Sequence, residues 1–126
     1  MEKKKKRTFI DSVRDCLNGC TFVMLGEDNF KREIGLAILA LILSYVLDIS
    51  RIEFIIVIIV IALVIVCEIF NTAIEKTVDL CTREYNELSK IAKDVSAFAV
   101  LTMCTFALVV GIVIFVPKII ILIGGH

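Results

Sequence analysis

The chain has 126 residues, of which 59% are hydrophobic and 22% are charged, and its formal net charge is zero. Together with a mean hydropathy of +0.94, this composition excludes a soluble globular protein and indicates a single membrane-embedded domain. The zero net charge conceals an uneven distribution of basic residues, so it excludes neither a nucleotide nor an anionic lipid as a partner. We expect no nucleic-acid partner.

Residues 8–25 are expected to form an amphipathic helix on the membrane surface. Apolar residues recur there at helical spacing between polar neighbours, as in helices that lie in the interface. The alternative is a cytosolic helix packed on the loop at 75–96. The apolar positions are Phe9, Ile10, Val13, Leu17, Cys20 and Val23.

Three apolar segments follow, and we expect each to cross the membrane as a helix. The helices are expected at about 30–49, 53–80 and 92–118. The apolar core of the first is short for a bilayer, but Lys31 and Arg32 can extend to the interface. Pro117 is expected to end the last span.

The basic residues indicate an orientation. Lys and Arg are concentrated before the first span and between the second and third, whereas the link at 48–53 carries only Arg51. Because positively charged loops stay in the cytoplasm, we expect the N-terminus and the 75–96 loop inside and residues 124–126 outside.

The second span carries a row of polar residues at its end. On a helix, Glu68, Asn71, Glu75 and Asp79 share one stripe of about 16 Å. Ionisable groups in a bilayer cost several kcal/mol unless they meet a partner, so the stripe predicts a functional site. Glu68 lies at headgroup depth, where a base could meet a lipid hydroxyl, and the acids beyond it could meet a metal-bound anion. A purely structural Glu68–Asn71 pair is the alternative.

Two further polar clusters should reach the same interface, one at 27–33 and one at 83–94. Carboxylates such as Glu27 and Glu75 suit Mg²⁺, which takes oxygen ligands, and Lys93 would neutralise phosphate charge. The alternative for each cluster is an ordinary band of charges beside the membrane. Since no glycine-rich phosphate loop or kinase catalytic loop is present, side chains on membrane helices would have to hold any nucleotide.

The segment Glu68-Ile-Phe-Asn-Thr-Ala-Ile-Glu-Lys-Thr-Val-Asp79 resembles the signature E-x-x-N-[ST]-A-I-E-x-x-V-D of the prokaryotic diacylglycerol kinase and undecaprenol kinase family. Matches at 27–33, 84–85 and 93–94 extend the resemblance over nearly the whole chain. It implies an all-α membrane protein with three transmembrane helices and an N-terminal surface helix, assembled as a homotrimer. It also implies transfer of the γ-phosphoryl group of MgATP to the hydroxyl of a membrane lipid, at the cytoplasmic side of the bacterial cell membrane.

The resemblance also implies roles for individual residues. Glu68 would be the general base and, with Glu33, would contact the lipid substrate. Glu27 and Glu75 would bind Mg²⁺. The nucleotide contacts would be Asn71, Glu75, Asp79, Glu84, Tyr85, Asn86, Lys93 and Asp94.

The sequence also bears on the choice of lipid substrate and on alternative functions. The absence of tryptophan and the ending Ile-Val-Ile-Phe-Val-Pro-Lys resemble the Gram-positive branch, which favours undecaprenol over diacylglycerol. The rival from another class is a small oligomeric proton or cation conductor that uses Glu68 as a relay. Residues 54–66 contain no polar side chain, which disfavours a conductor. A structural assembly subunit would leave Glu27, Lys93 and Asp94 without a purpose.

Overall fold

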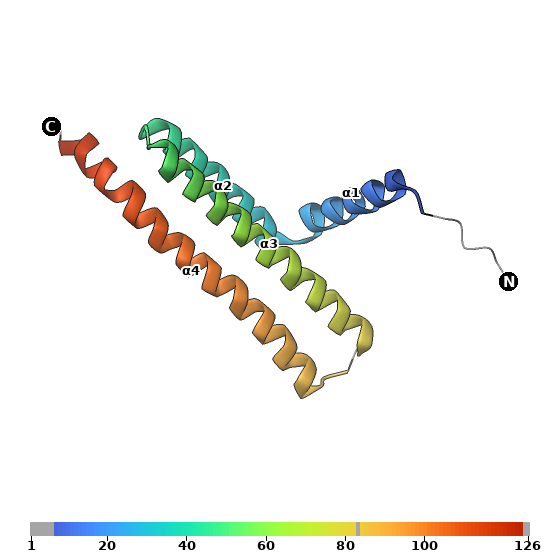
Figure 1. The fold of residues 1–126 in the computed structure, drawn as a ribbon. Helices are drawn as coiled ribbons and strands as arrows, with labels where there is room; N and C mark the ends of the chain where they lie inside the picture. The colour runs from blue at the N-terminus through green and yellow to red at the C-terminus, as the bar shows by residue number, and fades with distance from the viewer. Residues whose placement is uncertain (1–6, 83, 125–126) are drawn as a thin grey trace.

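A computed structural model describes residues 7–82 and 84–124. Residues 3–6, Arg83 and residues 125–126, which contributed to the predicted orientation or to the loop cluster, lie outside the described residues. Within these ranges there are four α-helices and no β-strand, which confirms the all-α prediction (Figure 1). The helices are α1 (Phe9–Gly26), α2 (Asp28–Val46), α3 (Arg51–Cys81) and α4 (Glu87–Gly124).

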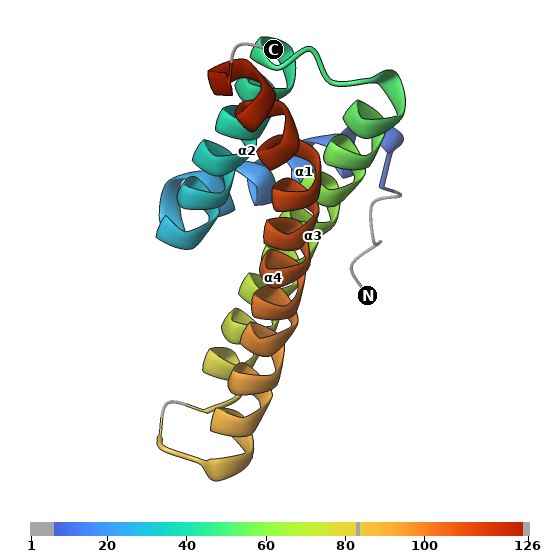
Figure 2. The same cartoon turned by 90° about the vertical axis from the view of Figure 1, so that its left-hand side faces the viewer.

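Helices α3 and α4 form a long antiparallel hairpin, and α2 packs against α3 (Figures 1 and 2). Helix α2 begins about midway along α3, so the half of the hairpin nearest its connecting loop extends beyond α2. The start of α2 therefore lies beside the polar half of α3.

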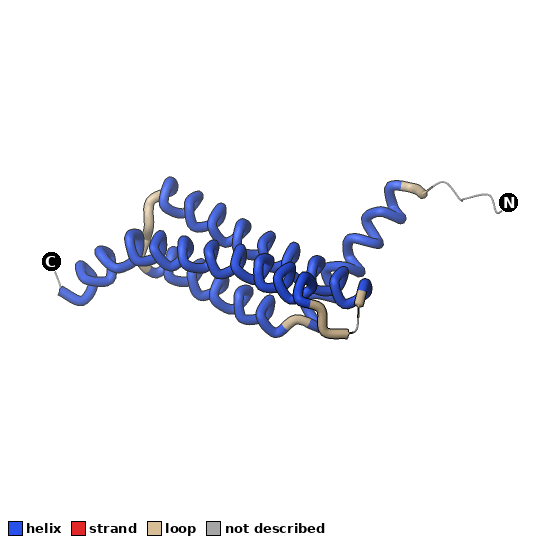
Figure 3. Tube along the Cα trace, turned by 90° about the horizontal axis from the view of Figure 1, so that it is seen from below, coloured by secondary structure: helices blue, strands red, loops and turns tan. Residues whose placement is uncertain are grey.

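Helix α1 projects away from the hairpin, as Figures 1 and 3 show. It starts at a capping box, in which Thr8 N–H donates to Asp11 Oδ2 over 2.9 Å and Asp11 N–H donates to Thr8 Oγ1 over 3.2 Å. The hydrogen bonds from the Thr8 backbone and hydroxyl hold the pKa of Asp11 below its usual value. The apolar face of α1 is largely exposed, with Phe9 84% accessible, as a helix lying on a membrane requires. Its contact with the 75–96 segment is at its end, where Phe22 meets Lys76.

Two of the described helices, α3 and α4, are long and apolar enough to cross a membrane. Helix α2 does not meet the same criterion of length and apolarity. The charges of Lys31, Arg32 and Glu33 fall within any stretch of α2 that is long enough to span a bilayer. A crossing by α2 therefore remains a prediction.

Pro117 lies inside α4, and the helix continues to Gly124. Our expectation that Pro117 ends the last span was wrong. Proline removes one backbone hydrogen bond, but membrane helices tolerate it where neighbouring contacts hold the chain. Directly after Pro117, Lys118 Nζ lies 3.2 Å from Glu53 Oε2 in the first turn of α3. This ion pair holds the last turns of α4 to the start of α3.

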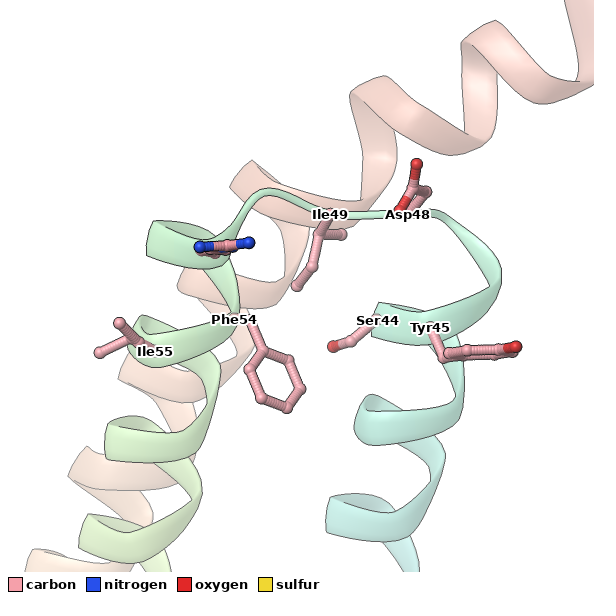
Figure 4. Close-up of a pocket in the computed structure, with 7 residues that line it drawn as sticks. Ser44, Tyr45, Asp48, Ile49, Phe54 and Ile55 are labelled. Atoms are coloured by element: carbon pink, nitrogen blue, oxygen red, sulfur yellow. The ribbon is translucent and has the colours of Figure 1, made fainter.

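A hollow of about 490 Å³ lies beneath the connection between α2 and α3. Figure 4 shows Phe54 of α3 and Ser44 of α2 facing each other across the gap, with Ile49 above them and Tyr45 pointing away. None of the predicted site residues lines this hollow. It lies at the end of the bundle opposite the polar half of α3.

Candidate active site

The polar stripe of α3 passes from the interior of the bundle to its surface. Glu68 and Asn71 are only 3% and 5% exposed, Glu75 is half-buried, and Asp79 is exposed. A charged or hydrogen-bonding group reaching the stripe from solution therefore meets Asp79 and Glu75 first, and Glu68 last.

Hydrogen bonds between α3 and α4 hold the middle of the stripe in place. Ser96 Oγ of α4 donates to Asn71 Oδ1 over 2.7 Å, and Asn71 Nδ2 donates to Glu75 Oε1 over 3.4 Å. One turn earlier on α4, Lys93 Nζ forms an ion pair with Asp79 Oδ1 at 2.5 Å. These contacts fix both the Asn71 amide and the Glu75 carboxylate, and they place a cation at the mouth of the stripe.

Glu33 of α2 lies at one end of an apolar groove of about 420 Å³ that runs between α2, α3 and α4. It is the charged residue among the groove's lining side chains, which are otherwise apolar apart from Cys104. Glu33 Oε1 lies 4.0 Å from Cys104 Sγ, and within the described part of the chain Glu33 Oε2 has no hydrogen-bond partner. Glu68 is close enough to act on Glu33 electrostatically. The groove thus leads from apolar surface to the Glu33 carboxylate, with Glu68 within electrostatic reach.

Glu27 approaches the same region from the junction of α1 and α2. It joins Glu75 in the electrostatic surroundings of Glu68. Its Oε1 is 2.9 Å from Lys76 Nζ, and its side chain is only 20% exposed. The Lys76 ammonium already binds this carboxylate, so the surroundings of Glu27 favour a positive charge.

The chain's donor set fits Mg²⁺. This ion usually takes one or two protein carboxylates, with substrate phosphates and water completing its shell. Glu27 and Glu75 supply two such carboxylates. Among residues 7–82 and 84–124, no group of three or more acidic, histidine or cysteine side chains could hold a metal by itself. A nucleotide would therefore have to bring the remaining ligands.

Four of the sequence-derived nucleotide contacts lie apart from this cluster. Glu84, Tyr85 and Asn86 are exposed in the α3–α4 connection, where Asn86 Oδ1 accepts from the backbone N–H groups of Leu88 and Ser89 and so caps α4. Asp94 is exposed on α4 and pairs with Lys90 at 2.9 Å. In this structure, Asn86 and Asp94 thus bind neighbours in sequence, and Tyr85 is 84% exposed.

Sequence reasoning missed two residues that the structure brings into the cluster, Ser96 and Lys76. Ser96 is buried and donates to the Asn71 side chain. Lys76 binds Glu27. The signals were a small polar residue one turn after Lys93, and a single lysine in the acidic run from Glu75 to Asp79.

The arrangement joins three chemical capacities. A buried carboxylate can take a proton, an apolar groove can hold a hydrocarbon tail, and exposed acids with Lys93 can bind a cation together with an anion. Phosphoryl transfer needs these elements because it depends on alignment, charge neutralisation and a proton acceptor.

Comparison with known proteins agrees with this chemistry. The family profile of prokaryotic diacylglycerol kinase matches residues 14–115. The chain is 38% identical over 92 residues to the undecaprenol kinase of Bacillus subtilis, covering 73% of this chain and 75% of that protein. It is 34% identical over 107 residues to the diacylglycerol kinase of Haemophilus influenzae, covering 84% and 91%. It is also 35% identical over 91 residues to the diacylglycerol kinase of Escherichia coli, covering 72% and 75%. The chain therefore belongs to the prokaryotic diacylglycerol kinase family, and it is a lipid kinase.

Proposed function

We propose that this lipid kinase transfers the γ-phosphoryl group of MgATP to the hydroxyl of undecaprenol, giving undecaprenyl phosphate. The observation that carries the proposal is the carboxylate of Glu33 at the end of an apolar groove, with the buried Glu68 within electrostatic reach of it. A lipid alcohol has a long tail and one hydroxyl, which this combination matches.

Glu68 acts as the general base in this proposal. It is buried, and it lies near Glu33, where the head of a lipid in the groove would arrive. Proton acceptance by a positioned carboxylate supplies typically 10²–10⁴-fold in rate. Glu33 would help to position the lipid head, since it lies at the end of the groove and its Oε2 has no hydrogen-bond partner among the described residues.

Glu27 and Glu75 would hold Mg²⁺, which neutralises the charge that develops on the transferred phosphoryl group. Lys93, Asp79 and Asn71 would position the nucleotide beside the metal. For Glu84, Tyr85 and Asn86, whose side chains are exposed, the proposal requires that the α3–α4 connection fold toward the nucleotide. Asp94 is exposed on α4, where the nucleotide would have to replace Lys90 as its partner.

Undecaprenol is the proposed substrate because the Bacillus subtilis relative, at 38% identity, is an undecaprenol kinase. Diacylglycerol is the second candidate because the Haemophilus influenzae relative, whose alignment covers 84% of this chain, is a diacylglycerol kinase. Both substrates present one primary hydroxyl, so Glu68 and Glu33 would serve either. The comparisons give no support to an ion conductor.

The enzyme is further proposed to work as a homotrimer in the bacterial cell membrane, with α2, α3 and α4 crossing it and the N-terminus in the cytoplasm. The exposure of most large apolar side chains on α2, α3 and α4 supports a membrane setting. Trimerisation would shield from lipid the outer part of the polar stripe, Glu75 and Asp79, which one chain leaves partly or fully exposed.

The test is a phosphorylation assay with γ-labelled ATP, in which purified protein in lipid nanodiscs is offered undecaprenol and diacylglycerol in separate reactions. We expect label on undecaprenol with the higher kcat/KM. Faster labelling of diacylglycerol would reverse the substrate assignment. Label on neither lipid, from protein that still binds ATP, would overturn the proposed function.

A further inference from the structure

Lys76 is the residue of the site that no motif explains. It follows Glu75 directly, so its side chain leaves α3 about 100° away from the polar stripe and points to the junction of α1 and α2. There Nζ lies 2.9 Å from Glu27 Oε1 and 5.7 Å from the centre of the Phe22 ring. One side chain thus connects α3 both with α1 and with the start of α2.

The surroundings of this ammonium are acidic. Glu27 is its closest partner, and Asp79 and Glu75 lie within electrostatic reach. The face of an aromatic ring also attracts a cation at this separation. Lys76 therefore occupies a place that favours positive charge, close to both proposed metal ligands.

A divalent ion and the ammonium would compete for Glu27. The carboxylate is only 20% exposed, and its Oε1 is already engaged, so a metal that binds this oxygen displaces Nζ. A lysine side chain is flexible, and that of Lys76 is half-exposed. Once displaced, its ammonium is within a side chain's length of any phosphate that the metal brings.

We propose that Lys76 holds Glu27 in the nucleotide-free enzyme, and that the arriving metal–nucleotide displaces the ammonium from Glu27 onto the phosphate oxygens. Lys76 is then a positioning residue that makes metal binding depend on the nucleotide. A metal alone must break the Lys76–Glu27 pair, whereas the metal–nucleotide supplies a new partner for the lysine. This inference rests on the proposed roles of Glu27 and Glu75.

The test measures binding rather than turnover. Full-length protein in nanodiscs is titrated with Mn²⁺ alone, followed by electron paramagnetic resonance, and with a non-hydrolysable ATP analogue in saturating Mg²⁺, followed by calorimetry. In Lys76→Met we expect Mn²⁺ alone to bind roughly 5–10-fold more tightly, because a neighbouring positive charge is removed. We expect the analogue to bind about 10-fold more weakly, because its phosphate loses a charged partner.

Lys118→Met is the matched control. Lys118 also pairs with a glutamate across two helices, at 3.2 Å, but at the other end of the bundle, so both affinities should stay unchanged. Lys76→Arg keeps the charge and should bind Mn²⁺ as the unchanged protein does. If Lys76→Met misfolds by size-exclusion chromatography, Lys76→Gln and Lys76→Arg supply the comparison.

A loss of both affinities in Lys76→Met, or no change in Mn²⁺ binding, would overturn the inference. Glu27→Gln separates this result from a failure of the proposed function. If it abolishes Mn²⁺ binding, the metal ligand stands and only the role of Lys76 falls. If it leaves Mn²⁺ binding intact, the assignment of Glu27 itself falls.

Discussion

The two ends of the helical bundle carry similar ion pairs but differ in charge balance. At the end that holds the hollow, two acids face two bases: Asp48 and Glu53 against Arg51 and Lys118. At the other end, the five carboxylates of the proposed site have two ammonium partners among the described residues, while the nearby Lys31 and Lys90 each pair with an acid of their own. The five are Glu27, Glu33, Glu68, Glu75 and Asp79, and the two are Lys76 and Lys93.

This difference in charge balance distinguishes charges that stabilise the fold from charges that are available to a ligand. A balanced set of charges is satisfied within the chain, as the Lys118–Glu53 pair illustrates. An excess of carboxylates between apolar helices is costly unless protons or cations from outside compensate it. Charge excess, rather than the presence of ion pairs, distinguishes the end that we propose binds the ligands.

The largest effect should come from the most buried acid. Glu68→Gln keeps the shape of the side chain and removes its basicity, so turnover should fall by about 10²-fold or more while the nucleotide still binds. Lipid phosphorylation and binding of the ATP analogue are measured on the same sample. An unchanged turnover would remove Glu68 from the role of base.

Glu75→Gln tests whether the charge excess serves a metal. With one of two ligands weakened, the Mg²⁺ concentration for half-maximal activity should rise by about 10-fold, within the range expected for one charged ligand. Glu53→Gln is the matched control, since Glu53 belongs to the balanced end and should leave the Mg²⁺ dependence unaltered. Equal shifts in both variants would contradict the comparison.

Ser96→Ala tests the support of the stripe. The hydroxyl donates to Asn71 Oδ1 over 2.7 Å in a buried setting, so its loss leaves an acceptor unpaired and should lower stability by about 1 kcal/mol. Nucleotide affinity should fall several-fold because the Asn71 amide is freed. Thr102→Ala removes a hydroxyl that bonds only its own helix at Phe98 O, and it should alter neither quantity.

The smallest effect is expected from Lys118→Met. Breaking an ion pair between partly exposed side chains changes stability little, so the thermal midpoint should drop by less than for Ser96→Ala, with lipid phosphorylation unchanged. A loss of activity comparable to that of Glu75→Gln would show that the two ends are coupled.

The sequence was sufficient for features that depend on one helix alone. Residue spacing within a single helix is enough to predict the polar stripe of α3. The burial of the stripe decreases along the helix from Glu68 to Asp79. The N-terminal helix follows from apolar spacing alone, with an expected start at residue 8 and an observed start at Phe9. The capping box of Thr8 with Asp11 and the capping role of Asn86 were not predicted, although both residues are preferred N-cap types.

Features that depend on how two helices meet were not predictable. The bond from Ser96 to Asn71 requires a particular rotation of α4 against α3, and Lys76 reaches Glu27 only because α2 begins beside that turn of α3. The spacing of residues within one helix does not tell how that helix is rotated or shifted against its neighbours. The expectation for Pro117 failed for a related reason: a general rule about isolated helices was applied where contacts with α3 hold the chain.

Glu33 Oε2 has no hydrogen-bond partner among residues 7–82 and 84–124, and this has a consequence for the end of the proposed reaction. The alcohol substrate is uncharged, but the phosphate ester formed from it would carry negative charge beside Glu33 and Glu68. Like charges repel strongly in a medium of low polarity. Once the metal and the nucleotide have left, the carboxylates that accept the alcohol would therefore repel the phosphate ester and favour its return to the lipid.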